Sequence, residues 1–288
     1  MMGNLHRRAG DAGPERGAWA RAVYADLEIR QSGLAAPSSQ GHLSGLQVGT
    51  DLLVAGPWRV GAFVGTLDGN VDVSGNALGS FGRVGGNDLR SNYLGAYATW
   101  IDDSGWYADA VLQGGRHSYS VRPDAALSAS GNASSVSASL EVGKSFALAP
   151  SLSIEPQVQL MHQSSRFDDV QIVGARVQQD ADGGWIGRLG VRVKGDFSTA
   201  AGRLQPYARI NVYRADSGAN VVSFLTPASV TRTSTANGYT STEVAGGFSL
   251  ALSEATMVYG EVGRLFSNSG DARVRSSVQG SLGVRVSW

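Results

Sequence analysis

The dominant pattern along this chain is an alternation of apolar and polar residues with a period of two. The C-terminal segment shows it most clearly, because one parity holds only apolar or small residues: Val278, Gly280, Leu282, Val284, Val286 and Trp288. The positions between them are small or polar. This alternation predicts β-strands with one apolar face.

Twelve segments of this kind follow one another along the chain. They lie near residues 17–30, 42–55, 57–71, 89–101, 105–121, 133–147, 151–166, 184–197, 202–215, 239–252, 255–267 and 274–288. Each has 13–17 residues, whereas strands of soluble proteins commonly have about 5–6. A strand that crosses a membrane needs about 9–11 residues, so these segments are long enough to span a bilayer.

The connections between the segments alternate in length. Short ones lie near 56–57, 102–104, 149–150, 199–201 and 253–254, and long polar ones lie at 31–41, 72–88, 122–132, 167–183, 216–238 and 268–273. Short turns on one rim and long loops on the other are typical of outer-membrane barrels. The sequence therefore predicts an all-β fold, a 12-stranded antiparallel transmembrane β-barrel with both termini on the periplasmic side.

A soluble all-β protein is the alternative, because its strands also alternate when one sheet face is packed. The two folds differ in where the apolar residues point: toward a core in the soluble protein, and outward to lipid in the barrel. Strand length, the even number of strands, the loop asymmetry and the terminal aromatic Trp288 together favour the barrel.

Composition narrows the function classes. The chain has 288 residues, 39 Gly, no Cys, and 24 basic and 24 acidic side chains. The zero net charge argues against a nucleic-acid binder, and the absence of Cys excludes disulfides and Cys-based zinc sites. No apolar run of 18 residues predicts a transmembrane helix, and residues 1–10 lack the apolar core of a signal peptide. We expect one barrel domain, residues 17–288, preceded by a linker or plug segment, residues 1–16.

If the apolar parity faces lipid, the other parity lines the lumen. The charged residues predicted to face the lumen are Asp26, Glu28, Arg30, Asp51, Asp109, Glu141, Glu155, Arg188, Arg192, Lys194, Arg209, Glu243, Glu261 and Arg285, joined by Tyr24, Tyr107 and Tyr207. Such charges are tolerated in a wet lumen. The alternative is that they pair across the lumen and only maintain the shape of the barrel.

A barrel of twelve strands leaves a lumen about wide enough for one helix or one extended hairpin. The segment from Leu5 to Ala9 could be the end of a helix that Gly10, Gly13 and Pro14 terminate. Its basic residues, which are His6, Arg7 and Arg8, would then meet the lumenal carboxylates. A solvated tail is the alternative.

The sequence predicts no catalytic residue, metal site or cofactor, since it lacks HExxH, GxSxG and a phosphate-binding glycine loop. An outer-membrane hydrolase could use rim histidines, here His42, His117 and His162, although interface or loop histidines are the better interpretation. The six tryptophans fall at strand ends: Trp19, Trp58, Trp100, Trp106, Trp185 and Trp288. All but Trp185 are expected in the periplasmic aromatic girdle.

Several stretches together resemble the translocator (β) domain of autotransporters, which serve type V secretion. They are Gly17-Ala-Trp-Ala-Arg21, Gly45-Leu-Gln-Val-Gly-Thr-Asp51, Gly95-Ala-Tyr-Ala-Thr-Trp100, Ser104-Gly-Trp-Tyr-Ala-Asp109, Ser139-Leu-Glu-Val-Gly143, Ile154-Glu-Pro-Gln-Val158, Gly187-Arg-Leu-Gly190, Gln205-Pro-Tyr207 and Gly283-Val-Arg-Val-Ser-Trp288. The resemblance covers residues 4–288 and is closest to the pertactin-like group, including its serum-resistance member.

This resemblance implies a monomeric anchor in the bacterial outer membrane that carries an N-terminal passenger to the cell surface through its lumen. A general outer-membrane channel is the alternative function. The implied partners are outer-membrane lipid, the chain's own passenger, periplasmic chaperones and the barrel-assembly machinery. That machinery would read a C-terminal signal formed by Leu282, Val284, Val286 and Trp288.

Some members of this family cut their own linker at an Asn-Asn pair, and no such pair occurs in this sequence. Self-cleavage is therefore not predicted. If a carboxylate did activate a linker asparagine, the candidates by parity would be Asp51, Glu141 and Glu155.

Overall fold

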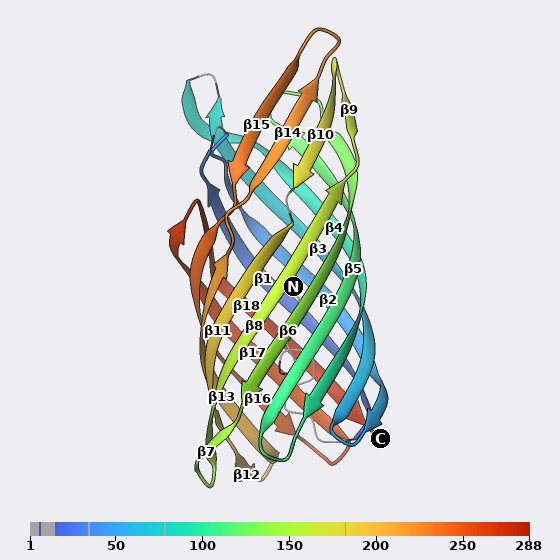
Figure 1. Cartoon of the computed structure of the whole chain (residues 1–288), viewed down its shortest axis with the longest axis vertical. Helices are drawn as coiled ribbons and strands as arrows, with labels where there is room; N and C mark the ends of the chain where they lie inside the picture. Colours follow the sequence, from blue (N-terminus) through green and yellow to red (C-terminus); the bar gives the residue numbers. More distant parts are fainter. Residues whose placement is uncertain (1–5, 7–14, 34, 78, 182) are drawn as a thin grey trace.

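The structure is a computed structural model that describes residue 6 and residues 15–33, 35–77, 79–181 and 183–288. It is a tall ring of tilted strands with a smaller sheet above it (Figure 1). The wall strands are β1 (Gly17–Gln31), β2 (Ser38–Ala55), β3 (Trp58–Ala77), β4 (Ser80–Ile101), β5 (Trp106–Pro123), β6 (Ala129–Lys144), β8 (Leu152–Phe167), β11 (Gly184–Gly195), β13 (Gly202–Ala215), β16 (Tyr239–Ala251), β17 (Thr256–Gly270) and β18 (Ala272–Ser287).

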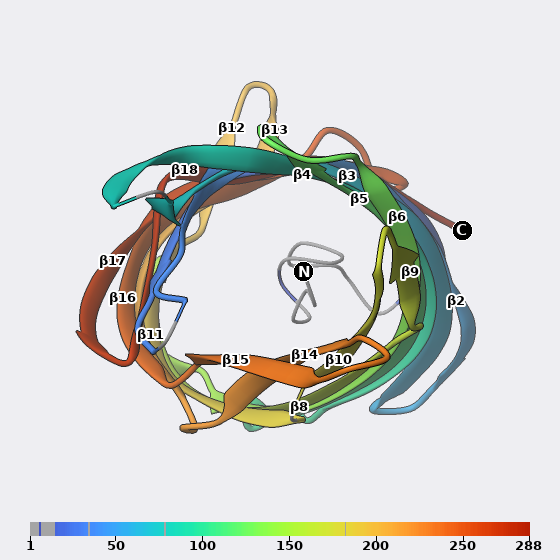
Figure 2. The same cartoon turned by 90° about the horizontal axis from the view of Figure 1, so that it is seen from above.

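Each wall strand pairs antiparallel with two neighbours. The main sheet has 14 strands, of which β7 (Phe146–Ala149) and β12 (Phe197–Thr199) are short side branches, so twelve strands form the wall. β8 pairs with both β6 and β11, and β1 pairs with β18, which closes the ring (Figure 2). The predicted 12-stranded antiparallel barrel is confirmed, and each predicted segment coincides with a wall strand.

A second sheet corrects the prediction for the long connections 167–183 and 216–238. They contain β9 (Val170–Ile172), β10 (Ala175–Ala181), β14 (Ala219–Leu225) and β15 (Val230–Ala236), paired in the order β15-β14-β10-β9. These strands form because their apolar residues pair across the two connections, with Val177 opposite Phe224. The sheet stands above the barrel on the long-loop side (Figure 1).

The distribution of side chains is inverted relative to a soluble protein. Large apolar residues are exposed on the outer face, and those that are at least 60% exposed include Leu46, Leu94, Leu189, Val262 and Leu282. The largest fully buried side chains are polar and include Arg192, Arg285, Gln47, Glu141 and Glu243. The wall therefore presents an apolar belt to lipid and a polar lining to the lumen, as a membrane barrel requires.

Trp19 departs from the predicted aromatic girdle. Trp58, Trp106 and Trp288 are exposed, whereas Trp19 is only 3% exposed. It packs in an internal apolar cluster whose members are Trp19, Phe63, Tyr93, Tyr97 and Val111. The prediction for Trp19 is wrong because this residue lies on the face of β1 that points into the barrel.

Candidate functional site

The lower end of the lumen is organised around Asp51, a buried carboxylate on β2. One of its oxygens accepts a hydrogen bond from the Tyr97 hydroxyl at 2.7 Å. The other accepts from the Gly17 amide at 3.1 Å and from the Arg285 guanidinium, and it lies 3.5 Å from Nε of Arg59. Four strands of the wall are thus tied to one carboxylate beside the start of β1.

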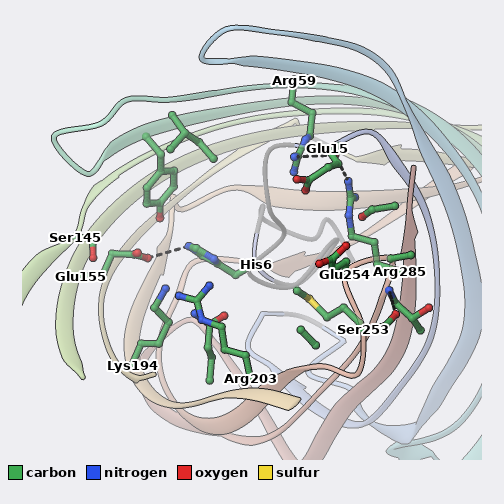
Figure 3. Close-up of a pocket in the computed structure, with 18 of the residues that line it drawn as sticks. His6, Glu15, Arg59, Ser145, Glu155, Lys194, Arg203, Ser253, Glu254 and Arg285 are labelled. Atoms are coloured by element: carbon green, nitrogen blue, oxygen red, sulfur yellow. Dashed lines mark hydrogen bonds and ion pairs between the residues drawn. The ribbon is translucent and has the colours of Figure 1, made fainter. Parts of the chain in front are cut away.

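The same two arginines hold the chain that leads into β1. The carbonyl oxygen of Glu15 accepts from Arg59 at 3.3 Å and from Arg285 at 3.1 Å (Figure 3). This part of the chain, just before the first strand, is therefore fixed to the inner wall. We refer to Asp51, Arg59, Tyr97 and Arg285 as the basal cluster.

A second buried ion pair crosses from β6 to β11. Arg188 donates to Glu141 at 2.6 Å, and the Tyr107 hydroxyl donates to the other oxygen of this carboxylate at 2.7 Å. Arg188 also donates to three side-chain amide oxygens, those of Gln157 at 2.9 Å, Gln159 at 2.9 Å and Asn211 at 2.8 Å. With these partners, both buried charges are neutralised and hydrogen-bonded, which removes most of the cost of burying them.

His6 lies inside the barrel between β8 and β11. Its Nε2 is 2.9 Å from a Glu155 oxygen (Figure 3). The Arg192 guanidinium lies 3.1 Å from its Nδ1. Because Arg192 can only donate, Nδ1 of His6 accepts from it. The His6 ring also packs edge-on against Tyr107, with 5.4 Å between centroids.

A third network joins β13, β16 and β17. Arg209 donates to Glu261 at 2.6 Å and lies 3.3 Å from Glu243, which also accepts from Asn211 at 2.6 Å. The Tyr207 hydroxyl donates to Glu261 at 2.9 Å. Because Asn211 contacts both Arg188 and Glu243, this network and the Glu141–Arg188 pair form one continuous polar lining.

The structure corrects three of the predicted lumen residues, which are Asp26, Glu28 and Arg30. They share the parity of Tyr24, which is 45% exposed and stacks on His42, whereas the other parity of β1 is buried. Glu28 instead forms ion pairs with Arg275 and with Arg30, whose side chain is 63% exposed. The prediction failed because the inner face of β1 is largely apolar.

Other predicted residues lie at several places on the barrel. Asp109 is 1% exposed, and its carboxylate accepts a hydrogen bond from the Thr99 hydroxyl at 2.5 Å.

Arg7 and Arg8 lie outside the described residues. In β18 and just after it, the four residues of the predicted assembly signal are exposed on the outer face: Leu282, Val284, Val286 and Trp288.

Sequence reasoning missed several polar members of the lining. Arg21 donates to Gln47 at 2.7 Å, and Gln159 donates to Ser139 at 2.7 Å. Arg59 and Tyr97 belong to the basal cluster. The period-two signal could have found Gln47, Ser139 and Gln159, since they share the parity of Asp51, Glu141 and Glu155 on their strands. No charged lumen residue was predicted on β3 or β4, so Arg59 and Tyr97 had no such reference.

No constellation for hydrolysis is present among the described residues. His117 lies between the hydroxyls of Ser91 at 2.8 Å and Ser135 at 2.7 Å, so both ring nitrogens are occupied by serines and none by an orienting carboxylate. Across the same part of the chain, no group of three His, Cys, Asp or Glu could hold a metal ion. The described residues also contain no helix that is long and apolar enough to span a membrane.

The periplasmic end of the lumen holds a cavity of about 680 Å³. Charged side chains converge on it from several strands: His6, Glu15, Arg59, Glu155, Lys194, Arg203, Glu254 and Arg285 (Figure 3). At its rim, hydrogen bonds from Arg203 hold the pKa of Asp196 below its usual range. The cavity is therefore polar and charged, and it lies at the end of the barrel where β1 begins.

Comparison with known proteins identifies the family of this chain. The autotransporter beta-domain model matches residues 18–263. The chain belongs to the autotransporter beta-domain family. It is 31% identical over 189 residues to the pertactin autotransporter of Bordetella bronchiseptica, covering 62% of this chain and 20% of that protein. It is 30% identical over 220 residues to the BrkA autotransporter of Bordetella pertussis, covering 73% of this chain and 20% of that one.

Solved structures of autotransporter barrels share the fold. The beta domain of the Bordetella autotransporter BrkA superposes with a TM-score of 0.74 and 24% identity, over 95% of this chain and 100% of that chain. The transport unit of AIDA-I from Escherichia coli gives 0.75 and 16%, over 94% and 90%. This chain spans about one fifth of the length of the pertactin and BrkA relatives. It is an outer-membrane barrel with long loops outside, and the start of β1 and the end of β18 lie on the periplasmic side.

Proposed function

We propose that this translocator domain anchors an N-terminal passenger in the outer membrane and carries it through the lumen to the cell surface. The observation that carries the proposal is the position of the chain before β1. His6 is held inside the barrel by Glu155 and Arg192, and Glu15 is bound to the basal cluster. These contacts of His6 and Glu15 support a path through the lumen for the segment that joins a passenger to the barrel.

The lining suits the passage of a polypeptide. Its charges are matched by partners on the wall itself, as in the Glu141–Arg188 pair and the Arg209–Glu261 pair. A wall whose charged groups are paired with one another offers a passing segment few strong ionic binding sites. The proposed function is transport without a catalytic step, a cofactor or a nucleic-acid partner, by a monomer.

Surface display tests the proposal. An epitope fused upstream of Asn4 through a linker should become accessible to antibody on intact cells. Heat-dependent gel mobility shows separately whether the barrel has folded. A folded barrel whose epitope is reached only after permeabilisation would overturn the translocator function.

Conductance in planar bilayers separates the translocator from the general channel. We propose that residues 1–16, including His6, Arg7 and Arg8, occupy the lumen, so the whole chain should conduct poorly. Replacing all three basic residues by glycine should raise conductance. A whole chain that already conducts as freely as this variant would favour the channel.

We further propose that the C-terminal strand is read by the barrel-assembly machinery after delivery by periplasmic chaperones. The exposed row Leu282, Val284, Val286 and Trp288 is available for recognition from outside the barrel. Trp288→Ala should slow insertion in cells, followed as the appearance of the heat-modifiable folded form in a pulse-chase. Unchanged assembly kinetics would contradict this role.

A further inference from the structure

A row of polar side chains crosses the outer face of the barrel just above its apolar belt. Cross-strand pairing aligns five residues on β3, β4, β5, β6 and β8, in the order Thr66, Asn92, Arg116, Ser134 and Arg166. All of them have the parity of the exposed apolar residues. The next row toward the periplasm is apolar except for Gly114 and Ser164: Val48, Val64, Leu94, Gly114, Val136 and Ser164.

Below the polar row, the outer face is hollowed by a groove of about 770 Å³. Its lining includes the exposed apolar side chains Leu46, Val48, Val64 and Leu94, and also Thr66, Asn92, Arg116 and Ser134 of the polar row. Gly114 leaves the floor open, because a Cβ at this position would meet nothing closer than the Ser135 carbonyl oxygen at 3.9 Å. The groove therefore combines an apolar surface with one cationic side chain.

The depth of Arg116 matches the outer leaflet. It lies ten residues beyond Trp106 on β5, and Trp106 is exposed at the periplasmic rim. At about 3.4 Å per residue and a tilt of about 45°, this separation corresponds to about 24 Å along the membrane normal. The apolar band of such barrels is about 25 Å tall, so Arg116 stands at its outer edge.

Arg116 and Arg166 also differ from Arg90 and Arg122, two exposed arginines on β4 and β5. Arg90 and Arg122 are paired with Asp68 and Asp88. Within the part of the chain that the structure describes, neither Arg116 nor Arg166 forms an ion pair, although both are exposed. Two uncompensated guanidinium groups at the headgroup level are suited to phosphate, which Arg binds through paired N–H donors.

We propose that this face is a binding site for a phosphorylated glycolipid of the outer leaflet. An acyl chain lies in the groove over Gly114, and the headgroup phosphate is bound by Arg116 and Arg166. The hydroxyl and amide groups of Thr66, Asn92 and Ser134 supply neutral hydrogen bonds along the same row. The site lies on the lipid face and is separate from the lumen.

Native mass spectrometry of the folded chain in detergent tests the site, with diphosphoryl lipid A, dephosphorylated lipid A and phosphatidylglycerol as probes. Diphosphoryl lipid A should form the dominant one-to-one adduct. Arg116→Gln and Arg166→Gln should each weaken its binding about five-fold, the equivalent of about 1 kcal/mol per membrane-facing charge. Arg90→Gln is the matched control and should bind normally.

Filling the groove gives an independent test. Gly114→Leu should reduce lipid A binding while the barrel stays folded in the gel-mobility assay. Gly246→Leu is the matched control, because Gly246 also faces outward on a distant strand and a Cβ there meets nothing closer than 3.6 Å. Equal binding of the dephosphorylated lipid or of phosphatidylglycerol, or unchanged binding by Arg116→Gln, would overturn the proposal.

Discussion

At the scale of single residues, Asp51 shows how the lumen wall balances buried charge. Its carboxylate has two arginine partners, one tyrosine hydroxyl and one backbone amide. The negative charge of this carboxylate compensates both arginines, and its removal leaves buried cations without compensation.

Asp51→Asn should therefore lower the free energy of unfolding by about 3–5 kcal/mol, the usual cost of breaking a buried ion pair. Unfolding in urea, followed by tryptophan fluorescence in detergent, measures the loss. Asp68→Asn is the matched control, since the Asp68–Arg90 pair is exposed and such pairs contribute about 0–1 kcal/mol. Similar losses in the two variants would contradict a structural role for the basal cluster.

The alternation along each strand is enough to assign Asp51, Glu141 and Arg188 to the inner face, because successive strand residues point to opposite sides. It does not reveal their partners. Asp51 and Arg285 are separated by 234 positions and come together only when the ring closes. On β1 the parity was assigned wrongly, since apolar residues there serve an internal cluster rather than the lipid face.

At the scale of the strands, several tyrosine side chains on the inner face lie directly opposite glycines of the neighbouring strand. Tyr259 is paired with Gly283, Tyr107 with Gly143, and Tyr97 with Gly61. A Cβ at Gly283 would lie 2.4 Å from the Tyr259 ring. The glycine lets the ring lie flat along the wall, and the ring covers the glycine backbone.

Gly283→Ala should consequently destabilise the barrel by about 1–3 kcal/mol, the range for overpacking. Gly246→Ala should have little effect because that site is open. A double-mutant cycle in urea with Tyr259→Ala is the decisive measurement. Coupling of the two substitutions is expected, and strict additivity would show that the ring and the glycine do not interact.

The wall strands were predictable because few other folds contain such long runs of alternating apolar and polar residues. The sheet formed by β9, β10, β14 and β15 was not. Its strands are short, from 3 to 7 residues, and lie within Gly-, Ser- and Thr-rich connections. A run of so few residues shows too little periodicity to identify a strand. The pairing of β10 with β14 also joins two connections that lie far apart in the sequence, and local patterns do not reveal such a pairing.

At the scale of the whole molecule, the alternation of short and long connections predicted which rim faces the cell exterior. The inverted distribution of polar and apolar residues agrees with a wall that crosses a membrane. What the pattern could not provide was the path of the chain before β1, because a single buried histidine such as His6 has no periodic signal.

The seam between β1 and β18 has a consequence for biosynthesis. Gly17 pairs with Ser287, so the first wall strand finds its second partner only when the last wall strand has been synthesised. Until then the sheet has two open edges, which are prone to join other chains. A truncated chain that lacks β18 leaves both edges unpaired. Closure of the ring therefore distinguishes a complete barrel from a truncated one. Such distant pairing also makes folding slow, so the unfinished sheet must be shielded in transit.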